Sequence, residues 1–295
     1  MGTNQTSAGG IASSASPWLP WWPVALGLLA LYVPTFYDLS QFTWNTEDQG
    51  HGPIILAVGG YLFWRARAAL LESPAEPAPL AGGVALGVGL LLYVLGRSQS
   101  IVQFEVGSLI PVVAGTLLIL NGWRAVRALW FPLFYLLFLV PLPGIFVVAI
   151  TGPLKQGVSI VAENLLYMVG YPIARQGVTL SIGPYQLLVA DACSGLHSIF
   201  SLSAIGLLYV YISRHARWLR NLILVLSLIP LAMLANVVRV VVLVLVTYHF
   251  GDEAGQGFLH GAAGLVLFVI ALALLFVEDK LLGYVLPDVA RRSAK

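Results

Sequence analysis

Residues 218–250 read WLRNLILVLSLIPLAMLANVVRVVVLVLVTYHF, an almost unbroken apolar run with an arginine, Arg239, in its interior. As a helix this run would be roughly 45–50 Å long, which exceeds the ~30 Å thickness of a bilayer's hydrocarbon core. It is therefore either one long, bent crossing or two crossings joined by a turn near Pro230.

The charges of the flanking loops decide between these two interpretations. Seven other apolar segments have about the length of a membrane span, and they lie near residues 18–37, 52–71, 80–96, 101–120, 129–150, 193–212 and 261–282. Basic residues gather after the second, fourth, sixth and eighth segments: Arg65 and Arg67; Arg124 and Arg127; Arg214, Arg217 and Arg220; Lys280, Arg291, Arg292 and Lys295. If residues 218–250 cross once, all four clusters lie on one side, as expected for cytoplasmic loops.

The composition supports the same interpretation. Hydrophobic residues make up 59% of the 295 residues and charged ones 9%, whereas soluble domains carry about 25% charged residues. We predict an all-α integral membrane protein with about eight spans and both termini in the cytoplasm. A disordered tail (1–17), which lacks the basic start of a signal peptide, would precede one polytopic domain (18–282) and a basic tail (283–295). The net charge of +2 is too small to indicate nucleic-acid binding.

Residues 151–192 are expected outside the membrane, at the start of an active-site half that covers about 151–265. Residues 154–169 have apolar positions at helical spacing, which predicts an amphipathic helix at the outer surface. Residues 177–190 contain two β-favouring runs around Gly183-Pro184, which predicts a hairpin. This hairpin leads directly to Cys193, the one cysteine in the chain.

Three ionisable residues are predicted to lie at one depth, the outer interface: Cys193, Arg239 and His260. A helix N-terminus favours a thiolate, and Gly195 beside it leaves room for a substrate backbone. A fixed guanidinium can bind an oxyanion, and an imidazole can transfer protons. One cysteine cannot form an internal disulfide or, alone, a zinc site, and no metal or organic cofactor is implied.

Each residue also has an ordinary structural interpretation. A lone cysteine is often an inert small core residue, and Arg239 could extend to the outer headgroups. His260 could be an interfacial histidine without a chemical role. Glu105 and Arg97 are expected to form a structural pair.

The motifs Ala192-Cys-Ser-Gly-Leu196, Asn236-Val-Val-Arg239 and Phe258-Leu-His-Gly261, in this order on three late spans, resemble the exosortase/archaeosortase family. His51-Gly-Pro53 at the end of the first outer loop is similar as well. The resemblance implies a bacterial inner-membrane cysteine transpeptidase with its active site facing the periplasm. It would act on exported proteins that carry a Pro-Glu-Pro-type motif, a membrane helix and a basic tail. An amine or water would then accept the acyl group from the enzyme.

By this resemblance Cys193 is the nucleophile, and Arg239 and His260 complete the triad. Supporting residues would be His51, Asp191, Ser194, Gly195, His197 and Asn236. Many family members have arginine where this chain has His197; the histidine favours the exosortase B subtype and offers a second candidate for proton transfer. Alternative functions are a protease that uses water alone, a non-catalytic component of exopolysaccharide assembly or export, and a transporter, whose polar groups would lie nearer the bilayer midplane.

The single crossing of residues 218–250 can be tested with topology reporters. A reporter fused after Arg220 should lie in the cytoplasm, and one inserted near Asp252 should lie in the periplasm, because the loop charges orient the helix. Two reporters on the same side would contradict the single crossing and the common depth of the three residues.

Overall fold

The computed structural model describes residues 21–45, 50–72, 76–188, 195–213, 217–261 and 263–286. The N-terminal half is a group of helices joined by short connections. These are α1 (Trp21–Asp38), α2 (Gly52–Glu72), α3 (Pro79–Ser98), α4 (Val102–Gly107), α5 (Leu109–Leu120), α6 (Trp123–Ala128) and α7 (Trp130–Tyr135), with a π-helical turn η1 (Leu39–Thr43) and a 3₁₀ turn η2 (Leu136–Leu139).

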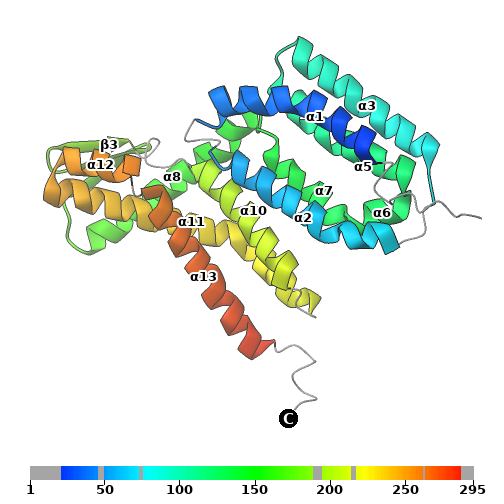
Figure 1. The fold of residues 1–295 in the computed structure, drawn as a ribbon. Helices are drawn as coiled ribbons and strands as arrows, with labels where there is room; N and C mark the ends of the chain where they lie inside the picture. Colours follow the sequence, from blue (N-terminus) through cyan, green and yellow to red (C-terminus); the bar gives the residue numbers. More distant parts are fainter. Residues whose placement is uncertain are drawn as a thin grey trace, which may run out of the picture.

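The C-terminal half contains the longest helices and one small sheet. Its elements are α8 (Gly144–Met168), β1 (Ile173–Gln176), β2 (Thr179–Ile182), β3 (Tyr185–Leu188), α10 (Gly195–Ser213), α11 (Trp218–Phe250), α12 (Asp252–Gly261) and α13 (Ala263–Val285). Figure 1 shows the sheet and α12 near the far end of α11, and α10 beside α2 of the N-terminal half, against whose core α10 packs. This arrangement confirms the predicted all-α membrane fold with a small β element before α10.

Five helical segments among the described residues are long and apolar enough to cross a membrane: 21–43, 79–98, 102–120, 144–168 and 218–250. The last of these confirms that residues 218–250 form one helix, with Pro230 inside it. Helices also occupy the other predicted spans, as α2, α10 and α13. The number of crossings and their orientation stay predictions.

Glycines set the close approach of α3 and α5. Gly82, Gly89 and Gly96 are spaced by seven residues on α3 and are buried. A Cβ at each would collide with backbone of α5 or α4, and a Cβ on Gly115 of α5 would collide with α3 in the same way. Small residues allow this backbone contact, which is a main source of packing energy between helices in lipid.

The predicted boundary between a fifth span and a separate amphipathic helix is wrong. Pro141 and Pro143 do interrupt the chain, since the preceding turn η2 ends at Leu139. From Gly144, however, one helix of 25 residues continues to Met168, with Pro153 inside it. Proline tends to end a helix before itself and is compatible with a helix start after it, so the pair at 141 and 143 separates two helices. The helix α8 ends at Met168, two residues before Gly170, which has a positive φ of 95°.

The predicted hairpin is present but belongs to a three-stranded antiparallel sheet in the order β1-β2-β3. The turn at Gly183-Pro184 joins β2 to β3, as predicted, with Ile182 paired to Tyr185. The additional strand β1 pairs Ile173 with Ile182. Alternate residues of the sheet, Ile173, Leu180, Ile182 and Leu187, are buried and pack on α8 and on Val240 and Val244 of α11.

A buried ion pair joins α11 to α13 at the opposite end of α11 from the sheet. Arg220 donates from Nε to Asp279 at 2.8 Å and from a terminal nitrogen to the backbone oxygen of the same residue at 2.9 Å. Tyr209 of α10 donates to Asp279 at 2.6 Å. Arg220, which sequence analysis assigned to an exposed basic loop, is therefore a buried residue in the first turn of α11.

Replacement of Asp279 by asparagine should destabilise the protein by about 3 kcal/mol, because it leaves the Arg220 guanidinium buried beside an uncharged group. The matched control is Glu76→Gln, which breaks the exposed pair between Glu76 and Arg124 and should cost less than about 1 kcal/mol. Thermal unfolding of the full-length protein, followed by tryptophan fluorescence, measures both. Equal shifts would show that the Arg220–Asp279 pair does not stabilise the bundle.

Candidate active site

Packing contacts define the antiparallel register of α10 against α11. A Cβ on Gly206 of α10 would collide with the side chain of Leu228 on α11. Four residues earlier on α10, Leu202 packs with Ala232, which is four residues later on α11. Pro230 lies between the two contacts on α11, so the proline does not shift the register.

The same register brings the start of α10 to the level of Arg239. Gly195 lies eleven residues before Gly206, and Arg239 lies eleven residues after Leu228. Eleven residues are close to three full turns of an α-helix, so both residues lie on the helix faces that meet at the Gly206–Leu228 contact. The register therefore predicts that Gly195 and Arg239 face each other. In the sequence, Gly195 comes two residues after Cys193.

Arg239 is buried within the protein. Its exposed fraction is 7%, and that of Asn236, one turn earlier, is 3%. Arg239 follows Ala232 and Ala235 by seven and four residues, which places it on the same helix face, and these alanines pack against Leu202 of α10 and Ala271 of α13. An arginine that extended toward lipid headgroups would expose its side chain, so burial argues against that interpretation of Arg239.

The start of α13 reaches the same level from the other side. Asp279, Leu275 and Ala271 of α13 meet α11 at Arg220, at Leu228 and at Ala235 in turn, which is an antiparallel register. Further along this register, Arg239 falls beside the first turns of α13, which begins at Ala263.

His260 lies near the C-terminal end of α12, a helix that the sequence did not predict, and precedes α13, the helix of the last predicted span. The chain reverses at Gly251, which has a positive φ of 91°, and α12 returns along the end of α11 (Figure 1). A Cβ on Gly255 would collide with Thr247, so this glycine allows close contact of the two helices. From Gly255 the backbone of α12 advances five residues, roughly 7 Å, toward Arg239 before it reaches His260.

His51 is joined to α10 through an aromatic contact. Its ring centroid lies 6.1 Å from that of Phe200, which is five residues after Gly195 on α10. Phe200 also packs against Phe138, with 4.9 Å between the two ring centroids. The predicted supporting residue His51, from the N-terminal half, is therefore beside the helix that follows Cys193.

Not all predicted site residues can be placed. Asp191, Cys193 and Ser194 lie outside the described residues, and for Gly195, His197 and His260 the structure describes the backbone and not the side chain. The direct contacts of the predicted triad therefore stay a prediction. Sequence reasoning missed the contact of Phe200 with His51 and with Phe138, because no local pattern links residues of separate helices. The close contact between Gly206 and Leu228 could have been predicted, because a glycine within an apolar helix is typical of a helix–helix contact.

The fold and the register thus define a polytopic membrane protein in which a buried arginine lies level with the start of a neighbouring helix. Residues 43–277 match the family model described as transmembrane exosortase. The chain therefore belongs to the transmembrane exosortase family. The match includes all nine residues that sequence analysis selected for the site. No curated protein and no solved structure matches the chain.

Proposed function

We propose that this exosortase is a cysteine transpeptidase or protease that cleaves the C-terminal sorting signal of exported proteins at the outer rim of the inner membrane. The observation that supports it is the packing register of α10 and α11, which predicts that Gly195 faces the buried Arg239. Family membership supports this function, since the family match includes the Cys193, Arg239 and His260 motifs. In the proposed site the Arg239 guanidinium would stabilise the oxyanion that forms when the Cys193 thiolate attacks.

The reaction that we propose begins with attack by the Cys193 thiolate on a backbone carbonyl carbon of the substrate. A carbon–sulfur bond forms, and the carbonyl oxygen becomes an oxyanion that the Arg239 guanidinium stabilises. The carbon–nitrogen bond then breaks, and His260 gives its proton to the leaving amine. An amine acceptor, or water, attacks the thioester, loses a proton to His260 and releases the thiolate.

The proposed substrate class rests on the resemblance to the exosortase family and on the predicted place of the site at the outer interface. A nucleophile at the outer interface would reach a peptide bond just outside a membrane helix of the substrate. The proposed substrates carry a Pro-Glu-Pro-type motif, then a membrane helix, then a basic cytoplasmic tail that follows the positive-inside preference. His51, Asn236 and the segment around Asp191 and Ser194 are the proposed substrate-positioning groups.

The Cys193→Ala variant tests the nucleophile. Coexpressed with an exported protein that carries the tripartite signal, it should leave the precursor uncleaved at normal enzyme levels, since no thioester can form. Ser203→Ala, a similar truncation further along α10, should process the precursor normally. Mass spectrometry of the product's new C-terminus separates transfer to an amine from hydrolysis. Cleavage at normal rate by Cys193→Ala would instead favour a non-catalytic role in exopolysaccharide assembly or export.

The two candidate histidines can be separated by substitution. His260→Ala should abolish processing, because α12 carries this residue toward Arg239 and it must donate a proton to the leaving amine. His197 lies in the first turn of α10 and follows Cys193 by four residues, which would be about 6 Å if the helix included both, so His197→Asn should keep substantial activity. Processing rates of both variants decide the question. A dead His197→Asn beside an active His260→Ala would reverse the assignment of the base.

A further inference from the structure

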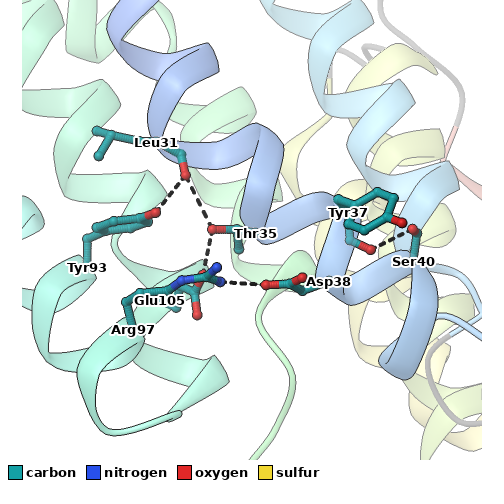
Figure 2. A network of polar contacts seen from close by, with 8 residues as sticks. All are labelled: Leu31, Thr35, Tyr37, Asp38, Ser40, Tyr93, Arg97 and Glu105. Carbon is teal, nitrogen blue, oxygen red and sulfur yellow. Dashed lines mark hydrogen bonds and ion pairs between the residues drawn. The ribbon is translucent and has the colours of Figure 1, made fainter.

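Polar contacts join the C-terminal half of α1 to α3 and α4. Thr35 donates to Glu105 at 2.6 Å, and Tyr93 donates to the backbone oxygen of Leu31 at 2.7 Å. At the same end, Arg97 bridges Asp38 at 2.6 Å and Glu105 at 3.1 Å. Figure 2 shows this network of polar contacts around Glu105, which is itself buried. The pairing of Arg97 with Glu105 confirms the expectation from sequence.

An apolar groove lies between α1, α2 and α5. The groove has a volume of about 530 Å³ and is lined by side chains such as Leu28 and Tyr32 of α1, Phe63 of α2 and Val113 of α5. It extends along α1 from Trp21 to Phe36, roughly 22 Å of helix. That length exceeds one leaflet of the hydrocarbon core, about 15 Å, so a complete acyl chain fits along it.

One charged side chain, Arg67, lines the groove, at the end of α2 near Trp21. Its guanidinium lies over the Trp64 ring, 4.1 Å from the centroid, and donates to the Trp64 backbone oxygen at 2.8 Å. Within the described part of the chain, no carboxylate forms an ion pair with Arg67. The groove therefore combines an apolar channel with a cation at one end. This arrangement is complementary to an anionic lipid, which has an apolar acyl chain and a negatively charged headgroup.

Volume and charge together indicate the kind of occupant. The groove volume lies within the roughly 300–1,000 Å³ typical of small-molecule sites. A transmembrane segment of a substrate, or of a second copy, would bring no negative charge to Arg67.

We propose that this groove binds one anionic phospholipid, with an acyl chain between α1, α2 and α5 and the phosphate at Arg67. The lipid fills the space between these three helices. Phosphate oxygens accept hydrogen bonds from guanidinium donors of Arg67 other than the one that donates to the Trp64 backbone oxygen. This site is separate from the proposed reaction and does not depend on it.

Native mass spectrometry of the full-length protein, released from nanodiscs with equal phosphatidylglycerol and phosphatidylcholine, tests the headgroup. Arg67→Gln should lower retained phosphatidylglycerol about fivefold, the effect of one basic residue at a membrane surface, and leave retained phosphatidylcholine unchanged. Arg67→Lys should keep most of the phosphatidylglycerol. The matched control is Arg65→Gln, which removes a charge two residues away that does not line the groove.

A second pair of variants tests the apolar channel. Gly60 lines the groove and a Cβ there meets no atom within 4 Å, as is true of Gly83 on α3, which does not line it. Gly60→Leu should therefore fill the channel without disturbing the fold and remove the bound lipid, whereas Gly83→Leu should retain it.

Three results would overturn the proposal. The first is an equal loss of phosphatidylglycerol in Arg65→Gln and Arg67→Gln, which would indicate diffuse attraction to the membrane surface. The second is full retention of lipid by Gly60→Leu. The third is a dimer, or a crosslink from position 60 to a substrate's membrane helix, that Gly60→Leu abolishes, since either would name a different occupant.

Discussion

The register of α11 between α10 and α13 is the constraint on which the proposed site depends. At one end the buried pair of Arg220 and Asp279 allows one alignment of α11 with α13, because a slip of one turn would leave two buried charges apart, at a cost of several kcal/mol. In the middle, Gly206 and the alanines at 232, 235 and 271 bring the three helices close together. With one end and the middle fixed, the other ends of the helices become level, and that is where Arg239 lies.

In the N-terminal half, two different kinds of contact hold the helices together. Apolar surface alone does not drive helices together in lipid, so contacts of small residues and polar pairs carry the specificity. The glycines of α3 provide backbone contact along its whole length with α5 and α4. The helix α1 instead uses polar contacts of Thr35 and Asp38, with Glu105 of α4 and Arg97 of α3. Its glycine Gly27 makes no close contact of the kind seen in α3, and the apolar groove lies along α1 from Trp21 to Phe36.

Much of the fold could be predicted from the sequence, and the failures share a cause. Apolar length predicted the helices, loop charge predicted that residues 218–250 form one helix, and Gly183-Pro184 predicted the turn between β2 and β3. The continuity of α8 was missed because Lys155 and Glu163 looked like the end of a span, although the helix needs only its backbone hydrogen bonds to continue. Strand β1 and helix α12 were missed because their partners, β2 and the end of α11, are supplied by tertiary packing.

For the candidate site, Arg239 could be selected from the sequence, but its burial, which indicates an interior role, could not be predicted. An arginine near the end of a membrane helix has two explanations, a headgroup contact or an interior role, and both produce the same sequence pattern. They differ in exposure: a headgroup contact needs the guanidinium at the surface, whereas Arg239 is 7% exposed and shares a helix face with Ala232 and Ala235. In the proposed mechanism the Arg239 guanidinium has an interior role, because its charge stabilises the negative charge that develops on the oxyanion.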